Sequence, residues 1–135
     1  MKPFAAYDCS MYALDKAINC YEKALIANPN YGEAYNNMGN TFKIKGEIDR
    51  AIESFKKAII LKPDFAEAHN NIGSTLRRLG SLDEAVLHYE RALNSNAKYY
   101  EASYNLGLTL HELGRFDQAE KSYKKAIAIR THYPP

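Results

Sequence analysis

Histidine and cysteine are the residues of this chain whose chemistry could support a metal ion or a covalent step. They are spread along the sequence, at Cys9, Cys20, His69, His88, His111 and His132. Neither cysteine has a histidine or a second cysteine at zinc-ligand spacing. The sequence also lacks a glycine-rich phosphate loop, an HExxH metal motif and a nucleophile elbow. It therefore predicts no catalytic residue, no metal and no cofactor, and we do not expect an enzyme.

Asparagine amides supply the second kind of polar chemistry. The stretch YNNMGN at 35–40 returns as HNNIGS at 69–74 and as SYNLGL at 103–108. Each amide offers a hydrogen-bond donor and an acceptor, so it could bind the backbone of a peptide. Asparagine is a mediocre helix former, however, because its amide competes for nearby backbone groups. The recurrence points to helices that repeat along the chain and present the amides on one face.

A period of 34 residues runs through the sequence. Small residues keep this step in four series: Gly39, Gly73 and Gly107; Gly46, Gly80 and Gly114; Ala17, Ala51, Ala85 and Ala119; and Ala24, Ala58, Ala92 and Ala126. An aromatic residue recurs in the same register, at Tyr21, Phe55, Tyr89 and Tyr123. Each period holds two amphipathic helices by its hydrophobic pattern. The first helix is expected at about 33–45, 67–79 and 101–113.

Glycine, aspartate and proline recur where these helices are expected to begin or end. A glycine follows each first helix, where a left-handed C-cap favours it. Three aspartates are expected to cap the second helices: Asp49, Asp83 and Asp117. Pro29 and Pro63 stand where a second helix ends, because proline cannot easily continue one. Glycine at 39, 73 and 107 is expected to let the two helices of a pair approach closely.

The repeated positions resemble the tetratricopeptide repeat family. The matching residues of the first full period are Tyr35, Met38, Gly39, Phe42, Ala51, Phe55, Ala58 and Pro63, with equivalents one and two periods on. The resemblance implies an all-α fold, an α-α superhelix (solenoid) of helix-turn-helix repeats. The repeats are expected at 32–65, 66–99 and 100–133, with a partial or divergent repeat at 1–31 and a tail at 134–135. In that first segment we expect the second helix at about 15–28, whereas a first helix near 4–12 departs from the pattern.

The candidate binding residues lie on the face of each first helix that points away from the packed side. By the resemblance, this face lines the concave groove of the superhelix. The candidates are Glu33, Asn36, Asn37, Asn40, Lys43, Glu67, Asn70, Asn71, Ser74, Arg77, Tyr104, Asn105, Leu108 and His111. Asn36 and Asn70 are expected to give the chain its own specificity. The row of Asn37, Asn71 and Asn105 is expected to contact the ligand; its alternative role is a bond to the neighbouring repeat.

The resemblance implies a protein–protein interaction module, an adaptor or scaffold that binds an extended peptide or a partner helix in the groove. Similar peptide-binding arrays, including the repeat region of O-linked N-acetylglucosamine transferase, use groove asparagines to bond the peptide. Two alternatives stay open. The chain could be a substrate-selecting segment of a larger enzyme such as a protein glycosyltransferase. It could also be a self-associating scaffold joined through Ile127 and Ile129 of an uncapped C-terminal helix.

The groove is less similar to the clamp with which co-chaperone repeats bind the C-terminal carboxylates of heat-shock chaperones. The clamp positions fall on Asn36, Asn40, Asn71, Glu101 and Asn105, of which only Asn40 and Asn71 match. The other three positions need cations, and Glu101 would repel a carboxylate. The sequence therefore argues against a chaperone C-terminal peptide as the partner.

The remaining residues and the composition indicate an ordinary globular protein. His69 stands where Tyr35 stands one period earlier, so we expect a core histidine, whereas His88 is expected to be solvated. Both cysteines are expected to be reduced. The net charge of +2 on 135 residues is too small to indicate a nucleic-acid or membrane partner. The apolar runs are too short to cross a bilayer and no signal peptide is visible, so a cytoplasmic location without membrane insertion is expected.

Overall fold

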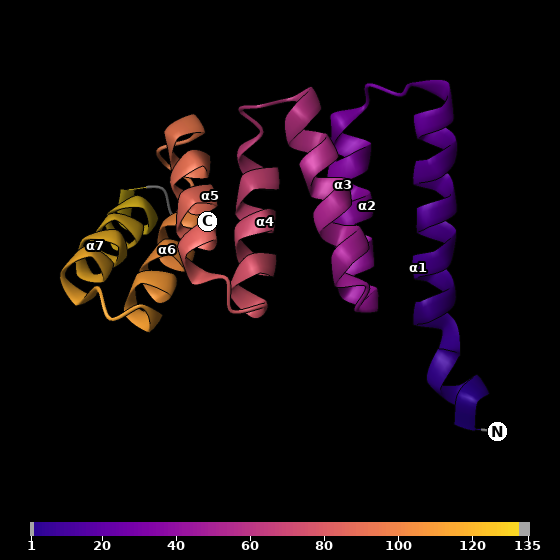
Figure 1. The fold of residues 1–135 in the computed structure, drawn as a ribbon, viewed down its shortest axis with the longest axis horizontal. Coiled ribbons are helices and arrows are strands. Elements are labelled where there is room, and N and C mark those ends of the chain that lie inside the picture. The colour runs from indigo at the N-terminus through magenta and orange to yellow at the C-terminus, as the bar shows by residue number, and fades with distance from the viewer. Residues whose placement is uncertain (1, 133–135) are drawn as a thin grey trace. The chain divides into compact units, whose positions relative to one another are not determined.

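The computed structural model describes residues 2–132, with side-chain surroundings for residues 11–131. These residues form helices in the order α1 (Lys2–Ala27), α2 (Gly32–Lys45), α3 (Ile48–Leu61), α4 (Ala66–Arg78), α5 (Leu82–Ser95), α6 (Tyr100–Glu112) and α7 (Phe116–His132) (Figure 1). No strand occurs among them, and the predicted all-α fold of helical repeats is confirmed. The predicted tail at 134–135 lies outside the described residues.

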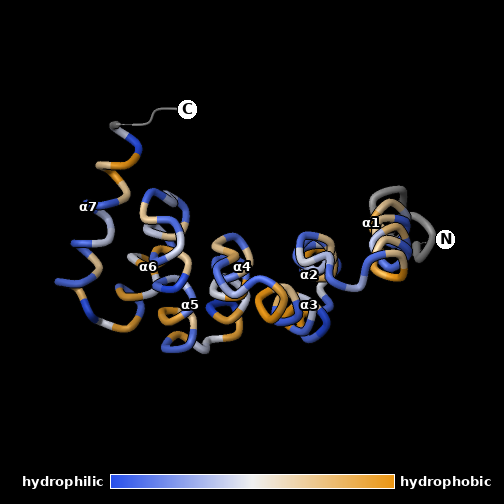
Figure 2. The backbone as a smooth tube through the Cα atoms, turned by 90° about the horizontal axis from the view of Figure 1, so that it is seen from above, coloured by the Kyte–Doolittle hydropathy of each residue, from blue (hydrophilic) through white to orange (hydrophobic). Residues whose placement is uncertain are grey.

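Three helical hairpins follow α1. Helix α2 packs on α3, α4 on α5, and α6 on α7, and Figure 1 draws the members of each pair side by side. Hydrophobic and hydrophilic residues alternate along each helix in Figure 2, as expected of helices that bury one face. The first helices of the hairpins begin one residue earlier than predicted, at Gly32, Ala66 and Tyr100.

A glycine in the left-handed conformation follows the first helix of each hairpin, as predicted. Gly46, Gly80 and Gly114 have φ angles of 86°, 83° and 79°, a region that strains residues with a Cβ atom. After Gly46, the amide of Glu47 donates a hydrogen bond to the carbonyl of Phe42 at 2.9 Å. This bond satisfies one of the carbonyls that a helix end leaves open.

The second helices begin differently from the prediction. The residues that precede α3 and α5 are Glu47 and Ser81, and neither side chain caps its helix. The three aspartates lie inside the first turns of α3, α5 and α7. Their predicted capping role is therefore wrong. A carboxylate in the first turn stabilises a helix through the positive end of the helix dipole instead.

Each hairpin closes where an aromatic ring of the second helix lies on a glycine of the first. A Cβ atom at Gly39 would stand 2.6 Å from the ring of Phe55, and one at Gly73 would stand 2.7 Å from the ring of Tyr89. Both distances are far below van der Waals contact, so the close approach needs glycine. Phe55 and Tyr89 are fully buried by this arrangement.

The segment before the first hairpin forms one continuous helix, α1, where the sequence predicted two helices near 4–12 and 15–28. Helix α1 packs on α2. Lys45, at the end of α2, pairs with Asp15 of α1 at 2.6 Å and with Glu47 at 2.9 Å. These carboxylates, Asp15 first, raise the pKa of Lys45. The division of the chain into repeats stays a prediction.

The chain forms two compact units, Met1–Pro63 and Asp64–Pro135. Helices α1 to α3 belong to the first unit and α4 to α7 to the second. Within residues 2–132, no helix combines the length and the apolar character that crossing a bilayer requires.

Candidate functional site

The predicted binding residues of the second unit lie on two neighbouring helices, α4 and α6. Two side-chain contacts join these helices. Arg77 of α4 forms an ion pair with Glu112 of α6. Asn105 of α6 donates from Nδ2 to Oδ1 of Asn70 on α4 at 3.3 Å. The structure thus brings the predicted residues of α4 and α6 onto one surface, while those of α2 belong to the other unit.

Most of the predicted groove residues are accessible to a partner. The exposed ones are Glu33, Asn37, Glu67, Tyr104 and His111. The half-buried ones are Asn40, Lys43, Asn71, Ser74, Arg77, Asn105 and Leu108. A partner can contact only accessible atoms, so these residues stay candidates for a binding role.

Asn36 and Asn70 do not lie on the accessible surface. Their exposed fractions are 2% and 8%. Asn70 accepts the hydrogen bond from Asn105, and a further hydrogen bond with Asn70 lowers the pKa of Tyr99 against the effect of burial. Buried amides need such partners because an unpaired one costs free energy. Their burial corrects the expectation that these two residues present specificity to a ligand.

Asn105 is partly committed to the fold as well. One of its amide hydrogens is directed at Asn70, one repeat earlier, so this residue follows the alternative in which the asparagine row bonds to the neighbouring repeat. An amide carries a second N–H and a carbonyl oxygen. Asn105 is only half-buried, so those remaining groups can still serve a ligand.

Charge is distributed unevenly along α4 and α6. Burial, followed by the carboxylates of Glu67 and Glu101, raises the pKa of Tyr99, so both acids act on this end of the surface. At the other end, where α4 and α6 finish, the ion pair with Glu112 offsets the charge of Arg77, one of the predicted groove residues. The surface is therefore acidic where the helices begin and nearly neutral around Arg77.

His69 and His88 face each other inside the hairpin of α4 and α5. Their Nδ1 atoms lie 3.2 Å apart, and the residues are 4% and 9% exposed. His69 is therefore a core histidine as predicted, whereas the prediction of a solvated His88 is wrong. Across residues 2–132, no three His, Cys, Asp or Glu side chains are grouped closely enough to hold a metal ion.

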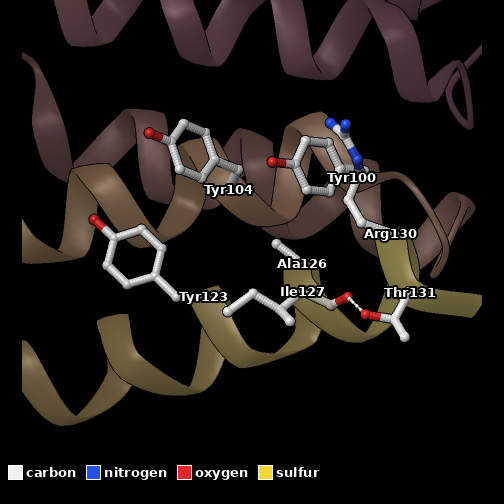
Figure 3. Close-up of a pocket in the computed structure, with 7 residues that line it drawn as sticks. All are labelled: Tyr100, Tyr104, Tyr123, Ala126, Ile127, Arg130 and Thr131. Carbon is white, nitrogen blue, oxygen red and sulfur yellow. Dashed lines mark hydrogen bonds between the residues drawn. The ribbon is translucent and has the colours of Figure 1, made fainter. Parts of the chain in front are cut away.

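A cleft between α6 and α7, shown in Figure 3, was missed by sequence reasoning. Tyr100 and Tyr104 extend from α6 beside Tyr123 and Ile127 of α7. The cleft has a volume of about 370 Å³. The planes of the Tyr100 and Tyr104 rings differ by only 8° at a centroid separation of 6.2 Å, and the ring of Tyr123 is tilted by 50° from that of Tyr104. Arg130 lies over the Tyr100 ring, 4.8 Å from its centroid.

One signal in the sequence could have pointed to this cleft. Tyr104 stands in the register of Asn36 and Asn70, so a large ring replaces a small amide in the last repeat only. Tyr104 was predicted to lie in the groove, whereas its ring lines the cleft with α7.

Three models of one protein family match the chain. One described as tetratricopeptide repeat matches residues 64–132, and another with the same description matches residues 20–53. A third, described as TPR repeat, matches residues 39–80. No curated protein matches the sequence significantly.

Solved structures of MamA are similar to this chain over most of its length. A crystal structure of MamA is 34% identical with a TM-score of 0.82, and the match covers 92% of this chain and 72% of MamA. A second crystal structure of MamA protein is 34% identical with a TM-score of 0.80, and covers 92% of this chain and 68% of that one. A structure titled MamA RS-1 ArsTM double mutant has a TM-score of 0.80 over 93% of this chain and 71% of the other, but its 15% identity shows the fold alone.

Proposed function

The chain belongs to the tetratricopeptide repeat family and is a protein-interaction or assembly module, and we propose that it binds an extended peptide along the accessible polar rows of its first helices. The observation that carries this proposal is the shared surface of α4 and α6. Asn71 and Asn105 are half-buried there, and Glu67 and His111 are exposed. Such a surface offers several hydrogen-bonding groups on a rigid helical support.

The amide chemistry favours recognition of a peptide backbone. A peptide presents C=O and N–H groups at regular intervals whatever its side chains, and amides can pair with both. Each unit carries exposed or half-buried asparagines on a first helix, at Asn37 and Asn40 in the first unit and at Asn71 and Asn105 in the second. This supports a groove of the amide-ladder kind that resembles the repeat region of O-linked N-acetylglucosamine transferase.

The charges on this surface speak against a ligand anchored by a terminal carboxylate. Glu67 and Glu101 are exposed where α4 and α6 begin, and they would repel an anion. Arg77 already pairs with Glu112. The proposed ligand is therefore not a C-terminal carboxylate peptide of the kind that the chaperone clamp binds.

A peptide selected from a random display library against the whole chain tests this proposal. Fluorescence anisotropy then compares its affinity for the wild type and for the triple variant Asn37→Ala, Asn71→Ala, Asn105→Ala. We expect the triple variant to bind at least about tenfold more weakly, a loss of about 1.4 kcal/mol. Asn94→Ala is the matched control, because Asn94 is exposed on the second helix α5. An affinity that the triple variant retains contradicts the groove, provided that circular dichroism shows unchanged helicity.

Self-association through α7 is the second candidate function. Ile127 on this helix is 64% exposed and is therefore accessible to a second copy of the chain. Light scattering over a concentration series decides this candidate. A mass that stays monomeric at the highest concentration, in both the wild type and Ile127→Glu, rules it out.

A further inference from the structure

We propose that the cleft between α6 and α7 is a separate binding site for an acidic peptide segment. In this proposal an aromatic or proline ring of the partner rests against Tyr104 and Tyr123, and a neighbouring carboxylate of the partner pairs with Arg130. The site does not depend on the amide rows of α4 and α6.

The tyrosine rings supply the apolar part of the site. Tyr104 is 42% exposed, and Ile127 continues the apolar lining on α7. Tyr100 and Tyr104 are nearly parallel, while Tyr123 closes the cleft at an angle. Flat rings stack on such faces with a gain beyond the burial of area alone. A volume of about 370 Å³ falls at the lower end of the range for ligand pockets, so it suits a small part of a peptide.

The charge around the cleft selects a carboxylate. Arg130 stacks on Tyr100 and forms no ion pair with any described residue. Arg130 is the charged residue among those that line the cleft. The stretch from Lys121 to His132 has no acidic residue and adds Lys121, Lys124 and Lys125 nearby in the chain, of which Lys124 pairs with Glu120 at 3.8 Å. A guanidinium fork held on an aromatic ring is well placed to donate two parallel hydrogen bonds to a carboxylate. Glu101 follows Tyr100 in the chain but acts on Tyr99 and does not line the cleft.

The preceding hairpin shows what the corresponding surface looks like when another helix covers it. Asn70 and Asn96 stand there in the register of Tyr104 and Arg130. Asn70 is buried because α6 lies against it and Asn105 donates to it. Tyr104 places a larger ring with a terminal hydroxyl at this position. The cleft between α6 and α7 therefore has different side chains from the surface that α6 covers in the preceding hairpin.

The same charges argue against a second copy of the chain as the occupant. A parallel contact between two α7 helices would bring Arg130 and the lysines of one copy against those of the other. Like charges in close contact cost free energy in any interface. An acidic partner would instead be attracted by these positive charges.

Two blocked hexapeptides test the proposal, acetyl-Gly-Ser-Phe-Asp-Ser-Gly-amide and the counterpart with Asn in place of Asp. Titration of the ¹⁵N-labelled whole chain, followed by amide chemical shifts, reports both the affinity and the place of binding. We expect the Asp peptide to shift residues of α6 and α7 around Tyr104 and Ile127. The Asn peptide should bind about threefold to fivefold more weakly, as for a lost exposed ion pair.

Three variants locate the effect. Arg130→Gln should abolish the preference for Asp over Asn, whereas Arg91→Gln, at an exposed arginine of α5, should preserve it. Tyr104→Asn, which restores the residue type of the other repeats, should weaken both peptides. The proposal would be overturned if the two peptides bound with equal affinity or if the preference for Asp survived in Arg130→Gln. It would also be overturned if the shifts centred on Asn71 or if neither peptide bound at millimolar concentration. Concentration-dependent shifts of α7 without peptide would also overturn it, in favour of a second copy.

Discussion

The Nδ1 atoms of His69 and His88 lie 3.2 Å apart in the interior of the hairpin formed by α4 and α5. The rings are nearly parallel, with an interplanar angle of 28°. One ring must donate its Nδ1–H and the other must accept it, so the pair links the two helices by a buried polar contact. The equivalent contact in the next hairpin is made by Ser103, whose Oγ donates to the carbonyl of Ser122 at 3.0 Å.

The stability losses from removing the two histidines should not add. We expect His88→Leu to lower the free energy of unfolding by about 1–3 kcal/mol, because it takes away the partner of a buried Nδ1. The double variant His69→Leu, His88→Leu should lose less than the sum of the two single losses, with a coupling of at least about 0.5 kcal/mol. Urea unfolding of the four proteins in the cycle measures the coupling. Additive losses would mean that the two rings do not act together.

Sequence reasoning reached the fold because the fold repeats. Gly46, Gly80 and Gly114 recur at one step and adopt the same left-handed conformation, so local chemistry and periodicity agree. The second helices started earlier than expected because an aspartate serves nearly as well in a first turn as at a cap. Propensity alone does not separate those two positions.

The site was predicted less well, because a helix pattern records only the packing within one hairpin. Asn70 points away from its own partner helix α5, and the pattern reads this as exposure. Helix α6 covers it, and that contact involves Tyr99 and Asn105, which are distant in sequence. The cleft was missed for the opposite reason: Tyr123 shares the register of the fully buried Phe55, but in the last hairpin it lines an open cleft.

Two glycines of α2 should respond oppositely to alanine. In Gly39→Ala the new Cβ atom would stand 2.6 Å from the ring of Phe55, so we expect a loss of about 1–3 kcal/mol in the free energy of unfolding. In Gly32→Ala the nearest atom is 3.7 Å away, and the gain in helix propensity should leave stability unchanged or raise it by up to about 1 kcal/mol. Thermal unfolding monitored by circular dichroism compares the two. Equal effects would show that the ring contact does not set the requirement for glycine.

Tyr89 should make the second unit sensitive to alkaline pH. Burial raises the pKa of Tyr89 to about 12, and its hydroxyl has no hydrogen-bond partner of good geometry among the described residues. Thr109 is close enough to oppose the rise slightly, but its own hydroxyl donates to the carbonyl of Asn105 at 2.7 Å. The unfolded chain loses the tyrosine proton near pH 10. The contribution of Tyr89 to the free energy of unfolding is therefore fully present below about pH 10 and is lost as the pH rises toward 12.

Tyr89→Phe tests this origin of the alkaline loss, because Phe55 already fills the equivalent position in the preceding hairpin. The variant should be at least as stable as the wild type at pH 8 and should lose less stability between pH 10 and pH 12. Part of the loss should remain, since burial also raises the pKa of Tyr99 and of Tyr123. Identical pH profiles for the variant and the wild type would assign the loss to those residues instead. Urea unfolding at fixed pH values provides the profiles.

Adjacent asparagines of α4 should separate a structural role from a binding role. Asn70 is buried and holds Asn105 and Tyr99, so we expect Asn70→Ala to lower the free energy of unfolding by about 1–3 kcal/mol. Asn71 is half-buried, and Asn71→Ala should change stability by less than about 0.5 kcal/mol. Chemical unfolding of both variants gives the comparison, and peptide affinity should follow the reverse order. If Asn70→Ala were stable but bound the peptide more weakly, Asn70 would be a binding residue of the groove, because only a ligand contact could then explain its effect.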